Sequence, residues 1–127
     1  MKLAIVEVWH HAVNARDVER VVALTSADVE IVGPRGSARG HDVLRQWTVA
    51  AGASFDPVRW FCGADGGGVV EQLATWPSEE ERTDPLGVAT SFTVSDGRIT
   101  RIARQSDLGS ALLDGGLTLD DQVSSNR

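Results

Sequence analysis

The stretch from Ala12 to Trp47 constrains the fold more than any other part of the chain, because its pattern changes type in a fixed order. It predicts a helix, a turn, a second helix, a strand, a Gly-Pro turn, a short strand and a third helix. Asp17 is a good N-cap for the second helix, and the β-branched run 29–32 is typical of a strand. The first helix begins upstream, where apolar residues recur at helical spacing: Ile5, Val6, Trp9, Ala12 and Val13.

The remainder of the chain predicts a meander of strands closed by a small helix. Residues 55–62 and 69–76 are rich in aromatic or β-branched side chains, and residues 86–94 alternate between large and small ones. Asp96-Gly97 is a strong signal for a two-residue hairpin turn, so residues 98–105 return as the partner strand. Three helices, then strands and a small helix, indicate an α+β domain.

The order of elements over residues 12–47 resembles the opening of the nuclear transport factor 2-like superfamily. That superfamily includes ketosteroid isomerases, SnoaL-like polyketide cyclases and many binding proteins. The resemblance implies an α+β cone, in which a curved mixed β-sheet wraps around the N-terminal helices over residues 1–117, and a flexible C-terminal tail over residues 118–127. It also implies a homodimer through the outer sheet face. Strands 55–62 and 69–76 carry apolar residues at both odd and even positions, so both of their faces should be covered, which favours such a partner.

Composition and charge exclude several classes of protein. At 127 residues the chain suffices for one domain, and its formal net charge of −6 argues against binding to nucleic acids or anionic membranes. The apolar start is interrupted by Glu7 and lacks a cleavage site of small residues, so it predicts a helix and not a signal peptide. No run approaches the ~20 apolar residues of a membrane span. Because Cys62 is the single cysteine, we expect a reducing compartment, the cytoplasm.

The sequence predicts neither a metal site nor a cofactor. It has three histidines and one cysteine without the spacings of zinc motifs, and the glycines of residues 63–68 lack a phosphate-loop ending. His10 and His11 are adjacent, so their side chains diverge by ~100° on a helix and cannot both face one ion. We therefore interpret them as solvated residues or as residues at the rim of a pocket.

The resemblance to ketosteroid isomerases can be followed residue by residue. Those enzymes need a carboxylate base, and an oxyanion hole made of a tyrosine hydroxyl and a protonated aspartate. In this chain the base position falls on Gly33, the tyrosine on Trp9 and the protonated acid near Thr90. None of the three can do that chemistry, and the chain has no tyrosine, so we expect no steroid isomerase activity.

The resemblance to SnoaL-like cyclases points to Asp107. In those enzymes a catalytic aspartate lies just before the C-terminal helix, and Ser106-Asp107-Leu108 stands at the matching place. Asp107 is also suited to be the N-cap of that helix. We favour the capping role, because Asp is among the commonest N-cap residues.

A cone with an open end offers a ligand site, and the chain supplies aromatic and charged residues for it. Its four tryptophans either line an apolar pocket or fill the core. Glu71 lies among apolar residues of a central strand, where it is either solvated at an edge or paired inside with Arg101 or Arg104. The predicted pocket consists of Trp9, Arg35, Leu44, Trp47, Glu71, Trp76 and Arg104.

These features predict a domain that binds a small apolar ligand in the cone. The first alternative is a proton-transfer enzyme of the cyclase or isomerase kind, with Asp107 or Glu71 as its catalytic carboxylate. The second is a non-catalytic, dimeric interaction protein whose cone is filled by its own side chains.

Overall fold

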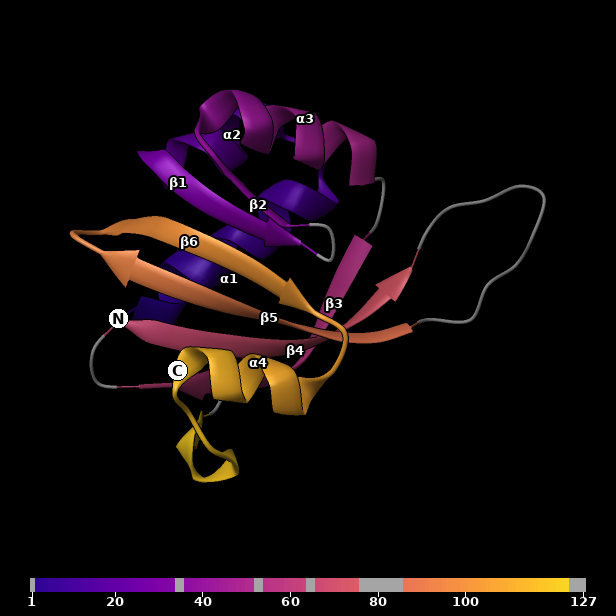
Figure 1. Cartoon of the computed structure of the whole chain (residues 1–127). Coiled ribbons are helices and arrows are strands. Elements are labelled where there is room, and N and C mark those ends of the chain that lie inside the picture. The colour runs from indigo at the N-terminus through magenta and orange to yellow at the C-terminus, as the bar shows by residue number, and fades with distance from the viewer. Residues whose placement is uncertain (1, 34–35, 52–53, 64–65, 76–85, 124–127) are drawn as a thin grey trace.

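The computed structural model describes residues 2–33, 36–51, 54–63, 66–75 and 86–123. Along them lie four α-helices and seven strands (Figure 1). The helices are α1 (Lys2–Asn14), α2 (Val18–Ala23), α3 (His41–Ala51) and α4 (Leu108–Gly115), followed by a 3-10 turn, η1 (Leu119–Asp121). The strands are β1 (Thr25–Gly33), β2 (Gly36–Arg39), β3 (Ser54–Cys62), β4 (Gly67–Thr75), β5 (Leu86–Ser95), β6 (Arg98–Gln105) and β7 (Gln122–Val123). No helix in the described ranges is long and apolar enough to cross a membrane.

All seven strands belong to one sheet with the order β2-β1-β6-β5-β4-β3-β7. β1 and β6 run parallel, with Thr25 opposite Ile99 and Ile31 opposite Ile102. The other neighbouring strands are antiparallel. The sheet curves around α1, and α2 and α3 lie at its β1–β2 end (Figure 1). The predicted α+β cone with a curved, mixed sheet is confirmed.

The apolar stripe of α1 packs into the concave side of the sheet. Val6, Trp9 and Val13 belong to one buried cluster with the inward residues of the strands. The chain then turns, and Asp17 caps α2 by accepting a hydrogen bond from the backbone N–H of Arg20 (3.3 Å). The predicted stripe and the predicted cap are thus both present, and they place α1 across the interior of the cone.

The convex face of the sheet is covered in part by α4 (Figure 1). A second apolar cluster lies beneath this helix and consists of Phe61, Val69, Ala89, Ala111, Leu112 and Leu117. Asp114 anchors α4 to the sheet by accepting hydrogen bonds from Ser91 Oγ (2.5 Å) and Arg101 Nη1 (2.8 Å). α4 therefore covers part of the face for which the sequence predicts a second subunit.

Two turns require glycine or a residue that tolerates positive φ. Asp96 and Gly97 have φ of 55° and 77°, the left-handed pair expected for the predicted hairpin between β5 and β6. Gly66 has φ of 92°, and a Cβ atom there would lie 2.5 Å from the carbonyl oxygen of Val94. Its own carbonyl accepts from the Val94 N–H (2.9 Å), which ties the start of β4 to β5.

After α4 the chain forms a short turn and a short strand, within the segment that the sequence predicts to be a flexible tail. Thr118 caps η1 through a capping box with Asp121. β7 then pairs antiparallel with β3, opposite Trp60 and Phe61. Gln122 and Val123 are therefore held on the domain by pairing with β3, while residues 124–127 lie outside the described residues.

Candidate functional site

The interior of the cone holds a cluster of packed aromatic rings. Trp9 stacks on Trp47 with ring centroids 6.3 Å apart, and it contacts Phe92 edge-on at 5.1 Å. Phe55 of β3 lies 6.3 Å from the Trp9 ring, and Leu44 of α3 is fully buried in the same cluster. The structure thus brings together Trp9, Leu44 and Trp47 of the predicted pocket, with Trp47 partly exposed.

Three polar side chains, His10, Gln72 and Thr90, form a buried row through this apolar interior, which we call the polar row. Thr90 Oγ1 donates to Gln72 Oε1 (2.8 Å), and Gln72 Nε2 lies 2.7 Å from His10 Nε2. His10 Nδ1 lies 2.8 Å from the carbonyl oxygen of Val6. A carbonyl only accepts, so the proton of His10 is assigned to Nδ1, and its Nε2 accepts from the Gln72 amide.

Burial lowers the pKa of His10 to about 4, because the imidazolium loses its hydration there. The bond to the Val6 carbonyl opposes this effect, and the charge of His11 adds to it. His10 is therefore neutral at neutral pH. The prediction of a solvated or rim position is wrong for His10, which is buried, whereas His11 is exposed. His10 follows Val6 by four residues and precedes Val13 by three, so its spacing on the apolar stripe is the signal that identifies it.

A cavity of about 530 Å³, which we call the mouth cavity, opens where β1 and β6 end and β5 begins. Arg104 is half-buried beside it, with its guanidinium carbon 5.6 Å from the centre of the Phe55 ring. Burial lowers the pKa of Arg104, although the group stays cationic. Arg104 stands opposite Thr90 in the β5–β6 register, so the mouth cavity adjoins the polar row. Its lining consists of Val32, Gly33, Leu86, Val88, Arg104, Gln105 and Ser106.

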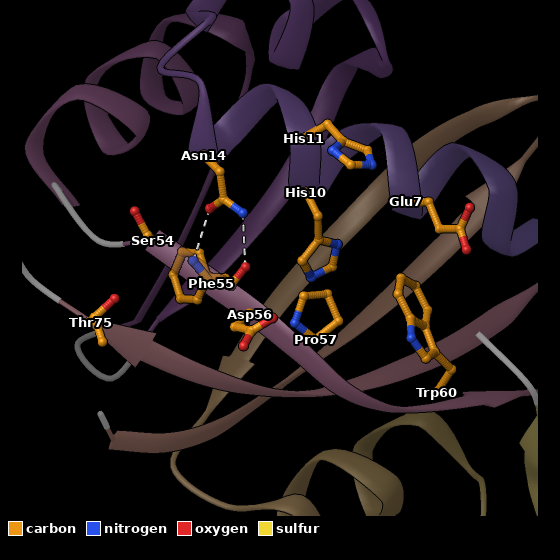
Figure 2. Close-up of a pocket in the computed structure, with 10 residues that line it drawn as sticks. All are labelled: Glu7, His10, His11, Asn14, Ser54, Phe55, Asp56, Pro57, Trp60 and Thr75. Carbon is orange, nitrogen blue, oxygen red and sulfur yellow. Dashed lines mark hydrogen bonds between the residues drawn. The ribbon is translucent and has the colours of Figure 1, made fainter. Parts of the chain in front are cut away.

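A second cavity, of about 550 Å³, lies between α1 and β3, and we call it the α1–β3 cleft (Figure 2). Asn14 closes one end of it. Its side-chain amide donates to the Phe55 carbonyl (2.9 Å) and accepts from the Phe55 N–H (2.8 Å). The lining comes from α1 (Glu7, His10, His11 and Asn14), from β3 (residues 54–57 and Trp60) and from Thr75.

Comparison with known proteins identifies the family. The sequence profile of the SnoaL-like domain matches residues 6–102. The chain belongs to the SnoaL-like domain family. No curated protein sequence matches this SnoaL-like domain.

Solved structures share the fold of this SnoaL-like domain at low sequence identity. A nuclear transport factor 2-like protein of unknown function from Cytophaga hutchinsonii has a TM-score of 0.73 at 12% identity, over 84% of this chain and 90% of that chain. For SalBIII, an epoxide hydrolase/cyclase-like enzyme, the TM-score is 0.72 at 18% identity, over 95% of this chain and 93% of that chain. For TerC the TM-score is 0.71 at 23% identity, over 90% of this chain and 96% of that chain.

Glu71 does not face the interior of the SnoaL-like domain, contrary to the predicted pocket. β4 turns Gln72 inward, so Glu71 lies on the outer face, because side chains alternate along a strand. There it accepts a hydrogen bond from Arg59 Nε of β3 (2.5 Å). Arg101, one of its two predicted partners, instead contacts Asp114 of α4.

Asp107 is the N-cap of α4, as the sequence predicts. Its Oδ1 accepts a hydrogen bond from the backbone N–H of Ser110 (2.7 Å), and the residue is exposed. This bond stabilises the charged form and lowers the pKa of Asp107. The capping role is confirmed, and it makes the carboxylate a weaker base.

The positions matched to ketosteroid isomerases carry none of that family's groups. Gly33 lines the mouth cavity, whereas Trp9 and Thr90 are buried in the interior. Arg35 and Trp76 of the predicted pocket lie outside the described residues. Within the described ranges, no three His, Cys, Asp or Glu side chains gather in a way that could hold a metal ion.

Proposed function

We propose that this SnoaL-like domain binds a small, largely apolar molecule through the mouth cavity. The observation that carries the proposal is the lining, in which Val32, Leu86 and Val88 surround one half-buried guanidinium, that of Arg104. The volume of about 530 Å³ falls in the range of roughly 300–1,000 Å³ that small-molecule sites occupy. A ligand with an apolar body and one anionic or acceptor group suits such a lining, because arginine donates charge-assisted hydrogen bonds.

Two further observations support a small-molecule ligand. The indole N–H of Trp9 is buried and has no hydrogen-bond partner in the described structure. A buried donor without a partner costs free energy, and a hydrogen-bond acceptor on a ligand that reaches the interior would remove that cost. Among the similar folds, TerC was co-crystallised with polyporic acid, and SalBIII is described as having a role in pyran ring formation.

A pair of fluorescent probes tests the mouth cavity. Anilinonaphthalene sulfonate has an apolar body and one anion, and N-phenyl-1-naphthylamine has a similar body without the anion. We expect Arg104→Gln to weaken the sulfonate by about tenfold and to leave the neutral probe unchanged, since one charge-assisted bond contributes roughly 1.5–3 kcal/mol. Gly33→Leu should weaken both probes, because a side chain at Gly33 meets open space and fills the cavity.

The control for this titration is Arg98→Gln, which removes an exposed arginine at the β5–β6 turn. Near-UV circular dichroism checks that each variant is folded before binding is compared. Affinities that are the same in Arg104→Gln, Gly33→Leu and Arg98→Gln would contradict the proposal. Binding of neither probe to the wild type would favour the filled cone of an interaction protein.

A proton-transfer enzyme is the second candidate, because His10 is a neutral imidazole with a fixed tautomer inside the cone. In this alternative a substrate displaces the Gln72 amide and gives a proton to His10 Nε2, while Nδ1–H stays bound to the Val6 carbonyl. Hydrogen–deuterium exchange at the α-carbon of 2-tetralone in D₂O, followed by NMR, tests it. Catalysed exchange that disappears in His10→Gln supports the enzyme, and exchange at the uncatalysed rate counts against it.

We also propose that the domain forms a homodimer through the part of the outer sheet face that α4 leaves open. Leu73 on that face is 38% exposed, beside the Arg59–Glu71 ion pair. Light scattering at micromolar concentration should give twice the mass of the chain, and Leu73→Arg should shift the population to monomer. A monomeric wild type would refute the dimer.

A further inference from the structure

The α1–β3 cleft is a second cavity, separate from the mouth cavity through which we propose that the apolar ligand binds. β7 pairs with β3 at Trp60 and Phe61, so in the described structure residues 54–58 have no strand beside them on that edge. Asn14 takes the place of a strand at Phe55 by bonding both of its backbone groups, and Pro57 has no N–H to donate. The edge therefore offers little to a further strand, and the space beside it is left as a cavity of about 550 Å³.

The lining of this cleft combines apolar surface with two carboxylates. Phe55, Pro57 and Trp60 supply the apolar part. Glu7 comes from α1 and Asp56 from β3, so the carboxylates reach the cleft from its two sides (Figure 2). In the described part of the chain neither carboxylate has a hydrogen bond or an ion pair, and the lining contains no lysine or arginine.

Two imidazoles complete the set of titratable groups in the cleft. His10 is held by Gln72 and by the Val6 carbonyl, and burial keeps it neutral. His11 is exposed at the rim. With His10 neutral, the carboxylates set the charge of the cleft, which is opposite to that of the guanidinium at the mouth cavity.

We propose that the α1–β3 cleft binds a small organic cation, a protonated amine on an aromatic or aliphatic body. The ammonium group donates hydrogen bonds to Glu7, the less exposed of the two carboxylates, and Asp56 adds negative charge to the cleft. The body packs on Trp60, whose ring face also attracts a cation, whereas the Phe55 ring already faces the Arg104 guanidinium. An organic cation fits this lining better than a metal ion, because the side chains of Phe55, Pro57 and Trp60 offer no ligand atoms to a metal.

Phenethylamine and its neutral analogue 2-phenylethanol test the site on the whole chain. Two-dimensional ¹H–¹⁵N NMR spectra report where each molecule binds. We expect phenethylamine to shift amide resonances of residues 7–14 and 54–60 in a saturable way, and 2-phenylethanol to bind at least about tenfold more weakly. Shifts confined to other residues, or equal affinities for the two molecules, would overturn the proposal.

Three variants separate the carboxylates from a general effect of charge. Glu7→Gln and Asp56→Asn together should weaken phenethylamine by about tenfold. Asp96→Asn removes one negative charge at a distant turn, where asparagine tolerates the positive φ, and it should leave the affinity unchanged. An unchanged affinity in the double variant, or an equal loss in Asp96→Asn, would refute the site. Because this probe and the sulfonate carry opposite charges, failure of one test leaves the other standing.

Discussion

His10 should make the domain lose stability in mildly acidic solution. The polar row accommodates the neutral imidazole, whose Nδ1 donates to the Val6 carbonyl and whose Nε2 accepts from Gln72. Protonation puts a hydrogen atom on Nε2, opposite an amide nitrogen that is itself a donor. The Gln72 amide then has to flip, so that its oxygen faces His10 and its nitrogen faces Thr90. Thr90 Oγ1 has to accept a hydrogen bond where it now donates one. The imidazolium also remains buried and without hydration.

The magnitude follows from the shift in pKa, from 6.5 for an ordinary histidine to about 4 for His10. This difference corresponds to roughly 3 kcal/mol of unfolding free energy. The unfolded chain takes up the proton first as the pH falls, so proton uptake favours unfolding. The stabilisation is therefore complete above about pH 6.5 and is lost as the pH falls through about 4. Such a loss is a large part of the ~5–15 kcal/mol that holds a typical domain folded.

The assay is urea unfolding, followed by circular dichroism, in steps from neutral pH down to about pH 4. His10→Gln keeps an amide that can bond Gln72 but does not titrate, so its stability should fall less steeply than that of the wild type. Asp114, whose pKa is lowered by its bond to Arg101, also loses stabilisation in acid, but it does so in both proteins. The difference between the two curves therefore isolates His10.

His11→Gln is the matched control, because it removes the neighbouring exposed imidazole and should keep the slope of the wild type. NMR titration of the ring protons gives the pKa of His10 directly. Equal slopes for the wild type and His10→Gln, or a measured pKa near 6.5, would show that the row does not exclude the charged ring.

Two further predictions concern backbone positions. Gly66→Ala should lower the unfolding free energy by roughly 3 kcal/mol, because the new Cβ meets the Val94 carbonyl oxygen and the φ of residue 66 is positive. Gly97→Asn is the control, because residue 97 has a positive φ but open space around it, and this variant should change the unfolding free energy little. Equal losses in the two variants would refute the steric argument. Asp107→Asn should keep the stability of the wild type in thermal unfolding, whereas Asp107→Ala should be less stable, because Asn caps a helix as Asp does. A folded Asp107→Asn that loses a measurable activity would instead favour catalysis.

Local patterns are enough to predict most elements of this fold. The alternation along β5 and the Asp96-Gly97 turn specify a hairpin from neighbouring residues alone, and the stripe of α1 shows which face is buried. The short strand β7 could not be predicted in this way. It exists because β3 offers an edge at Trp60, and an edge is a property of the assembled sheet.

The site was harder to predict than the fold, because strand faces are ambiguous when both are covered. Val69 and Val70 are both fully buried, one beneath α4 and one inside the cone, so parity did not tell which way Glu71 points. The burial of His10 is hard to predict for a related reason. A histidine is polar and suggests a solvated position, although its spacing places it on the apolar stripe of α1. Its burial depends on Gln72, a partner that comes from a distant strand.

The parallel pairing of β1 with β6 has a consequence for the order in which the domain forms. Hairpins β3–β4 and β5–β6 join strands that are close in sequence. The pairing of β1 with β6 instead joins Thr25 to Ile99, so β1 cannot complete its pairing before β6 is present. On the ribosome, β1 is therefore made long before the strand that completes it. Until β6 emerges, the apolar side of α1, Trp9 included, has no finished sheet to cover it, and this exposed surface is open to association with other chains.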